Sequence, residues 1–125
     1  MKAPLLLACL ALLAATVAGC SAPSDYATPD QDADMRYVIH MAASGNRFVP
    51  AKAEVPVGST VVWSNDGATP HNVVANDGSF TSDSEDPNFL QQGEEYAHTF
   101  NEPGTVHYQC HLHAGMDAVL KVTEA

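Results

Sequence analysis

The sequence predicts a small all-β domain, an antiparallel β-sandwich, preceded by an N-terminal segment that does not belong to it. From Arg36 onward, short runs of β-branched, aromatic and other apolar residues are separated by turn residues. No stretch shows sustained helical periodicity. A chain of 125 residues is long enough for one domain and too short for two ordinary ones. About seven short strands in roughly 90 residues are typical of a two-sheet sandwich.

The expected strands follow one another between residues 37 and 122. Tyr37–Met41 is the first, and Phe48–Val57 follows, with prolines at 50 and 56 that mark edges or bends. Thr60–Trp63 is rich in the β-branched and aromatic residues that favour strands. The remaining strands are expected at His71–Ala75, Tyr96–Phe100, Val106–Cys110 and Ala118–Val122, with an acidic, serine-rich loop at residues 79–94.

The N-terminal segment, residues 1–19, has the pattern of a secretory signal peptide. Met1-Lys2 is a positive start, and Ala3–Ala18 is apolar or small apart from one proline. This run is shorter than the about 20 residues of a membrane-spanning helix, and it lacks the polar face of a core helix. It ends in Val-Ala-Gly-Cys, which resembles the lipobox of bacterial lipoproteins. We therefore expect lipidation of Cys20, with plain cleavage and a free cysteine as the alternative.

An acidic segment, residues 20–35, separates this cysteine from the first strand. Ser21–Met35 contains two prolines, four aspartates and almost no aliphatic residue. Such a composition cannot bury enough apolar surface to offset the entropy lost on ordering. The sequence thus predicts a disordered tether between a membrane anchor and a domain at residues 36–125. The protein is expected to be exported and to lie on the periplasmic or other extracytoplasmic face of a membrane.

The residues that indicate a chemical function lie between 108 and 116, in the sequence YQCHLHAGM. Cys110, His113 and Met116 have the spacing C-x2-H-x2-M, directly after one expected strand and before the next. His71 lies at the end of another expected strand. Two imidazoles, one thiolate and a weak axial methionine are the ligand set of blue-copper electron-transfer sites. Thiolate and thioether stabilise Cu(I) and imidazole accepts both oxidation states, so one copper ion could alternate between Cu(I) and Cu(II).

Four segments of the chain resemble a known family, the cupredoxins of the plastocyanin, amicyanin and halocyanin type, over residues 37–124. They are VPVGSTVVWSND at 55–66, TPHNVV at 69–74, the T-F-x-x-P-G turn at 99–104, and YQCHLHAGM. The resemblance implies a Greek-key β-sandwich in which His71, Cys110, His113 and Met116 bind copper. It also implies that Asn72 ties the two ligand-bearing segments together by hydrogen bonds. The short Cys–His–Met spacing is nearer to amicyanin than to plastocyanin, which weakens the inference of a photosynthetic partner.

We therefore expect a monomeric protein that carries single electrons between membrane-associated redox partners and is not an enzyme. His113 would be the exit for the electron, within an apolar patch of Leu112, Ala114 and Gly115 where donor and acceptor proteins dock transiently. Three strong ligands and one weak ligand leave no open position for a substrate. With 15 acidic and 5 basic residues, the net charge of −10 excludes nucleic acid as a partner. This charge fits either steering toward a basic redox partner or adaptation to salt.

Several alternatives remain open from the sequence alone. Cys110 could be an inert core cysteine and Met116 a packing residue. Periplasmic copper binding or delivery is the main alternative function, and a cupredoxin-fold domain without copper is another. His111 resembles the histidine of the Cys-His pair in multicopper oxidases, which need more His-x-His pairs than this chain has. Structural zinc is disfavoured because a thioether is a poor zinc ligand. Of the other histidines, we expect His40 and His107 to face solvent and His98 to be partly buried.

Overall fold

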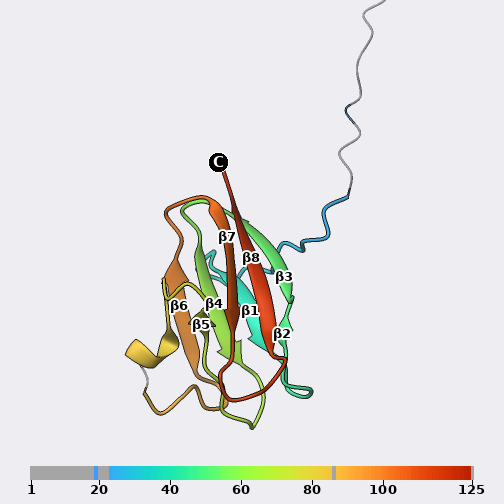
Figure 1. Ribbon diagram of the computed structural model, residues 1–125. Coiled ribbons are helices and arrows are strands. Elements are labelled where there is room, and N and C mark those ends of the chain that lie inside the picture. The colour runs from blue at the N-terminus through green and yellow to red at the C-terminus, as the bar shows by residue number, and fades with distance from the viewer. Residues whose placement is uncertain (1–18, 20–22, 86, 125) are drawn as a thin grey trace, which may run out of the picture.

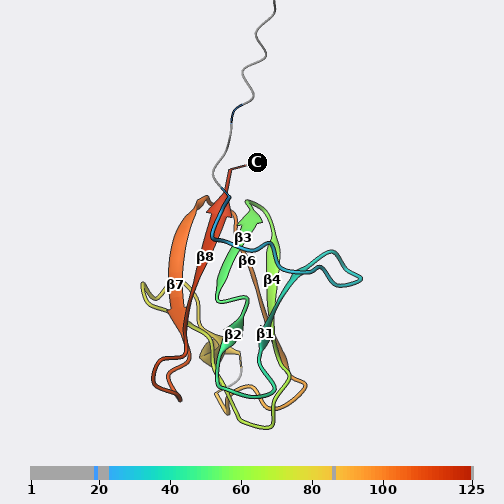
Figure 2. The same ribbon diagram turned by 90° about the vertical axis from the view of Figure 1, so that its right-hand side faces the viewer.

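The structure, a computed structural model, describes residues 19, 23–85 and 87–124, and these form two packed β-sheets (Figure 1). One sheet contains β1 (Tyr37–Met41), β2 (Phe48–Val49), β4 (Thr60–Asn65) and β6 (Glu95–Thr99). The other contains β3 (Lys52–Pro56), β5 (Val74–Ala75), β7 (Gly104–Gln109) and β8 (Asp117–Thr123). The predicted all-β sandwich is confirmed, and Figure 2 shows β7, β8 and β3 in one layer and β1 and β4 in the other.

Two predicted strands differ from those observed. The run Phe48–Val57 divides into β2 and β3, which join different sheets. Pro50 lies at the break, because proline has no N–H to donate to a strand ladder. The run His71–Ala75 is a regular strand only in β5, although His71 forms an isolated antiparallel bridge with Leu90. The expected loop at residues 79–94 contains a short 3₁₀ helix, η1 (Ser82–Ser84).

The two sheets are mixed, which corrects the expected antiparallel pairing at two of the six strand pairs. β1 pairs with β4 in parallel, and β3 pairs with β8 in parallel. The pairs β1–β2, β4–β6, β5–β7 and β7–β8 are antiparallel. The side chains of a strand alternate between its two faces whatever the direction of its neighbour, so the apolar pattern carries no information on strand direction.

The structure also differs from the predicted disordered tether at residues 20–35, because residues 27–35 are ordered against the sandwich. The Ala27 N–H donates to the Lys52 carbonyl, and the Glu54 N–H donates to the Ala27 carbonyl, both at 2.9 Å. The carboxylate of Asp32 pairs with Arg36 at 2.6 Å. The Val38 N–H also donates to the Asp30 carbonyl, so backbone hydrogen bonds to both sheets hold this segment without a large apolar surface. Composition does not reveal such bonds. The predicted signal peptide and Cys20 lie outside the described residues, apart from Gly19.

An aromatic cluster fills the space between the sheets. Trp63 on β4 is fully buried, and its ring lies 5.4–6.3 Å, centroid to centroid, from the rings of Phe80, Tyr96, Phe100 and Tyr108. These separations are typical of favourable aromatic pairs. Because Tyr108 lies on β7, two residues before Cys110, the cluster supports the strand that leads into the predicted ligand loop.

The three histidines outside the ligand motif lie largely as expected. His107 is exposed, and His98 is partly buried between the rings of Phe80 and Phe100. Burial lowers the pKa of His98, and the nearby carboxylate of Glu85 opposes this effect. His40 is half-exposed, with its Nδ1 2.7 Å from a carboxylate oxygen of Asp66. Among the described residues, no helix has both the length and the apolar character needed to cross a membrane.

Candidate metal centre

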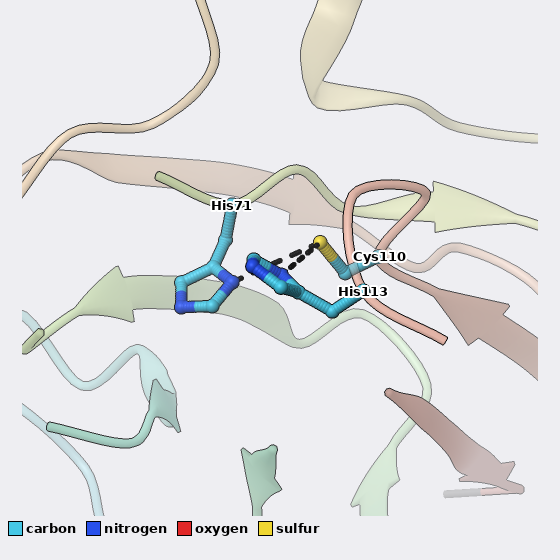
Figure 3. Close-up of side chains that lie close together, drawn as sticks. All are labelled: His71, Cys110 and His113. Atoms are coloured by element: carbon cyan, nitrogen blue, oxygen red, sulfur yellow. Dashed lines mark hydrogen bonds between the residues drawn. The ribbon is translucent and has the colours of Figure 1, made fainter. Parts of the chain in front are cut away.

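Two loops at the same end of the sandwich bring the predicted ligand residues together (Figures 1 and 3). The β4–β5 connection carries His71, and the β7–β8 loop carries the three others; both loops lie at the lower end of the molecule in Figure 1. The Cys110 Sγ lies 3.8 Å from His71 Nδ1 and 3.6 Å from His113 Nδ1. Figure 3 shows the three side chains pointing toward one another. All three ligand atoms lie within 4.8 Å of one another.

The environment of these side chains is dry. His71 and Cys110 are buried, and Cys110 is a free cysteine. Met116 is 1% exposed, and His113 is only partly buried. Burial lowers the pKa of His71, and the neighbouring His113 lowers it further. The neutral imidazole, which has a free lone pair for a metal, is therefore favoured at His71.

The separations fit a transition-metal ion. Ligands bonded at about 2.1 Å through nitrogen and about 2.3 Å through sulfur, roughly 120° apart, lie about 3.8 Å from each other. The observed distances of 3.6 and 3.8 Å between Cys110 and the two histidines match this value. The donor set of two imidazoles and one thiolate is that of a trigonal copper site. In donor chemistry and in the two Cys110–histidine distances, the residues present therefore fit copper.

Backbone hydrogen bonds close the β7–β8 loop and bring Met116 back beside Cys110. The Cys110 N–H donates to the Met116 carbonyl at 3.0 Å, and the Met116 N–H donates to the His113 carbonyl at 3.3 Å. Gly115, between these residues, has φ +78°, a left-handed conformation that favours glycine. The tight spacing C-x2-H-x2-M therefore produces a closed loop in which the thiol, the imidazole and the thioether belong to one turn.

Asn72 makes the hydrogen bonds between the two loops that the family resemblance implies. Its side-chain Oδ1 accepts from the His111 N–H at 2.7 Å, and its own backbone N–H donates to Cys110 Sγ at 3.5 Å. Asn72 is buried, so both contacts are shielded from water. Residues that orient metal ligands in this way contribute substantially to metal affinity.

Sequence analysis missed two polar residues that support the site. Asn65, which the sequence placed only within the VPVGSTVVWSND segment, is fully buried; its Nδ2 donates to the Thr69 and Leu90 carbonyls at 2.9 Å each. These bonds hold the chain two residues before His71 and the segment that pairs with His71, whose own N–H donates to the Leu90 carbonyl at 3.1 Å. Asp83, read only as part of an acidic loop, accepts hydrogen bonds from Asn72. The segment that resembles cupredoxins includes Asn65 but gave it no role, and nothing in the sequence singled out Asp83.

The surface around His113 has the composition that was expected for a docking patch. Leu112 is 40% exposed, and Ala114 and Gly115 are exposed beside it. His111 is also exposed, with its Nε2 3.3 Å from the Gln109 side-chain nitrogen. Within the described ranges, the one group of three or more candidate ligands close enough to hold a metal is His71, Cys110 and His113. His111 thus does not join a second cluster there.

Comparison with known proteins agrees with this fold and donor set. The pattern that defines the copper-binding proteins of the plastocyanin/azurin family matches residues 35–123. Plastocyanin of Sambucus nigra is 36% identical over 84 residues, covering 61% of this chain and 85% of that protein. The structure of a reduced tryptophan-to-tyrosine mutant of amicyanin superimposes with a TM-score of 0.62 and 27% identity, covering 74% of this chain and 86% of amicyanin.

A copper enzyme is also similar in structure. The copper-containing nitrite reductase of Thermus scotoductus SA-01 superimposes with a TM-score of 0.62 and 29% identity, covering 72% of this chain. The match covers 23% of the enzyme, so this chain corresponds to less than a quarter of that protein.

The fold and the site define a cupredoxin, a β-sandwich with a copper-type donor set at one end. The chain belongs to the plastocyanin/azurin family of copper-binding proteins, and its cofactor is copper. Membership of this family implies a small copper protein of the electron-carrier type.

Proposed function

We propose that His71, Cys110, His113 and Met116 hold one copper ion and that the protein carries single electrons between redox partners, without acting as an enzyme. The observation that supports this most directly is the preformed group of two imidazoles and one thiol within 4.8 Å. When bound, copper supplies a one-electron couple between Cu(II) and Cu(I). The chain supplies two soft sulfur ligands, which stabilise Cu(I), and two imidazole nitrogens, which bind copper in both oxidation states.

The surroundings of these four residues suit rapid electron transfer. The hydrogen bonds of Asn65, Asn72 and the β7–β8 loop hold the side chains in place from both loops. Burial of His71, Cys110 and Met116 excludes water from three of the four positions. A rigid, dry site changes little in geometry when its charge changes, which lowers the reorganisation that accompanies transfer.

His113 is the proposed exit for the electron. It is the most exposed of the proposed ligands, and the exposed Leu112, Ala114 and Gly115 surround it in sequence. A small apolar patch of this kind favours weak, short-lived docking of a donor and then an acceptor, to a monomer of this protein.

The proposal is tested by visible and EPR spectra of the soluble domain, residues 23–125, after addition of one equivalent of Cu(II). We expect intense visible absorption from the thiolate and a narrow copper hyperfine splitting. Retention of copper against a strong chelator separates a carrier from a copper-delivery protein, since delivery needs ready exchange. A colourless protein that binds copper, or a blue one that releases it at once, would contradict the carrier proposal.

Replacement of Met116 by leucine is expected to keep the blue colour and raise the reduction potential. The axial thioether donates to the metal, and its loss disfavours Cu(II) more than Cu(I). Leucine has a similar volume, so the cost in folding free energy should stay below about 1.5 kcal/mol. A spectroelectrochemical titration measures the potential, with Met41→Leu as the control because Met41 is also buried but lies in β1. An unchanged potential in Met116→Leu would remove the axial assignment.

The acidic segment, residues 77–95, is proposed to attract a basic redox partner from a distance. Glu85 and Glu94 are exposed there, and charges of this kind act over about 10 Å at 0.1 M salt. The rate constant for electron transfer to a small basic redox protein is expected to fall about tenfold or more between low and high salt. Stopped-flow measurements with Glu85→Gln plus Glu94→Gln should show a weaker salt dependence, whereas Glu124→Gln, near the other end, should not. A rate constant that is independent of salt would remove the steering proposal.

We further propose that the protein is exported and that lipid on Cys20 anchors it to the extracytoplasmic face of a membrane. Residues 23–26 leave the sandwich at the end opposite the metal loops (Figures 1 and 2). The seven Cα-to-Cα steps from Cys20 to Ala27 can span at most about 25 Å when the chain is extended. The metal end would therefore face away from the membrane, toward partners that extend from it or diffuse above it.

A Cys20→Ala variant is expected to move the protein from the membrane fraction to the soluble fraction. Each lipid methylene buried in the bilayer contributes about 0.8 kcal/mol to membrane binding. Cell fractionation and the mass of the intact protein measure the change, and Ser24→Ala serves as a control. Equal membrane association of the Cys20→Ala and wild-type proteins would contradict lipidation at this residue.

A further inference from the structure

A carboxylate from outside the two metal loops touches the network around Cys110. Both oxygens of Asp83 lie 3.2 Å from Asn72 Nδ2. The other end of the same amide, Asn72 Oδ1, accepts from the His111 N–H, and the Asn72 backbone N–H donates to Cys110 Sγ. Asp83 is thus two hydrogen bonds away from the proposed copper ligand. It is neither a ligand nor a sequence neighbour of one.

The hydrogen-bonding chemistry of the three groups determines which way the Asn72 amide faces. An ionised carboxylate only accepts hydrogen bonds, and a backbone N–H only donates them. The Asn72 NH₂ must therefore face Asp83, and its oxygen must face His111. A flipped amide would place a donor against the His111 N–H and an oxygen against a negative charge. Asp83 consequently selects the one orientation that ties the two loops together.

Asp83 is itself held firmly by the start of η1. Its backbone N–H donates to the Thr81 hydroxyl at 3.2 Å, which caps the short helix. The neighbouring Ser82 is buried and exchanges two hydrogen bonds with Val73: the Val73 N–H donates to Ser82 Oγ, and the Ser82 N–H donates to the Val73 carbonyl, both at 2.9 Å. These contacts join η1 (gold in Figure 1) to the residue that follows Asn72. The carboxylate is therefore presented from a fixed position.

We propose that Asp83 is a positioning residue that locks the Asn72 amide and, through it, the Cys110–His111 backbone, and that its charge favours Cu(II) over Cu(I). This inference rests on the proposed copper site. Two effects follow that can be separated. The hydrogen bonds from Asn72 hold the loops in both the copper-free and the copper-bound protein. The negative charge acts on the potential, because it stabilises the more positive oxidation state.

The positioning effect is measured in the copper-free protein by hydrogen exchange of the His111 amide. In Asp83→Ala the Asn72 side chain loses its partner, and we expect exchange to be about fivefold faster or more. In Asp83→Asn the new side-chain oxygen can still accept from Asn72, so exchange should stay within about twofold of wild type. Copper affinity of Asp83→Ala should fall about tenfold, the lower end of the range for residues that orient ligands.

The charge effect is measured as the ratio of reduced to oxidised copper protein at equilibrium with a redox mediator of known potential. Asp83→Asn should shift this equilibrium toward the reduced protein by at least about threefold. Glu85→Gln is the matched control: it removes the same charge two residues away, on an exposed side chain with no hydrogen bond to Asn72. Its effect should be smaller because solvent screens an exposed charge.

The results separate this inference from the proposed function. Unchanged exchange at His111 in Asp83→Ala, or an Asp83→Asn shift no larger than that of Glu85→Gln, would overturn the role of Asp83. A wild-type protein that forms no blue site would remove the proposed function. Hydrogen exchange is measured without copper, so it would still decide whether Asp83 positions the loop. Because asparagine is isosteric with aspartate, the Asp83→Asn comparison also remains available if Asp83→Ala does not fold.

Discussion

Replacement of Cys110 by serine is expected to abolish the intense visible absorption of the copper-loaded protein. The colour of a blue-copper site arises from charge transfer between the thiolate and Cu(II), and a serine hydroxyl provides neither the soft donor nor the anion at neutral pH. The affinity for copper should fall by more than the about 10- to 100-fold that is typical of residues that only orient ligands. Titration with Cu(II), followed by visible and EPR spectroscopy, measures both effects.

The serine variant should still fold, which allows the spectral result to be interpreted. The serine oxygen can accept from the Asn72 N–H in place of the sulfur, and the loop bond from the residue 110 N–H to the Met116 carbonyl uses only backbone atoms. A circular dichroism spectrum and a urea unfolding curve of the copper-free variant check this point. His107→Gln, at an exposed histidine, is a control that should keep the colour. An intense blue band in Cys110→Ser would show that another residue is the strong copper ligand.

Truncation of Trp63 to alanine is expected to lower the free energy of unfolding by about 3–5 kcal/mol. The side chain is fully buried and touches four aromatic rings that come from both sheets and from the segment after β5. Its removal leaves a cavity that the rigid strands cannot close completely. Because total stabilities of domains are about 5–15 kcal/mol, this one change is expected to remove much of the stability of the sandwich.

Urea unfolding of the copper-free protein, followed by circular dichroism, measures this loss. Circular dichroism is needed because the variant lacks the single tryptophan of the chain. Trp63→Phe should be less destabilising, since a phenyl ring retains part of the contacts. Val49→Ala, at a valine that is 41% exposed, should change the free energy by about 0.5 kcal/mol or less. A loss below about 1 kcal/mol in Trp63→Ala would mean that the aromatic cluster does not dominate the core.

The sequence by itself was sufficient for the all-β class, and it singled out the candidate ligands that the structure brings together. Strand positions follow from short runs rich in β-branched and aromatic residues, and Thr60–Trp63 and Tyr37–Met41 were expected close to where β4 and β1 lie. The group Cys110, His113 and Met116 could be predicted because its members are three residues apart on one loop. Their convergence therefore depends on a single turn rather than on the whole fold. His71 and Asn72 could be predicted only through the resemblance of the PHNVV segment to cupredoxins.

Only the tertiary structure decided how distant segments meet. The parallel pairing of β1 with β4 and of β3 with β8 depends on chain connections, whereas the side-chain pattern of a strand is the same for either direction of its neighbour. Backbone hydrogen bonds hold residues 27–35, from Ala27 to β3, from Val38 in β1 to Asp30, and within the turn at Asp32, and every residue except proline has the N–H that such bonds need. The Asp83 carboxylate accepts a hydrogen bond from the Asn72 side chain, eleven residues earlier in the sequence. The composition of the segment around Asp83 indicates only a solvated loop. Local spacing therefore predicted the three candidate ligands of the β7–β8 loop, while contacts between segments bring His71 to them and hold the group in place.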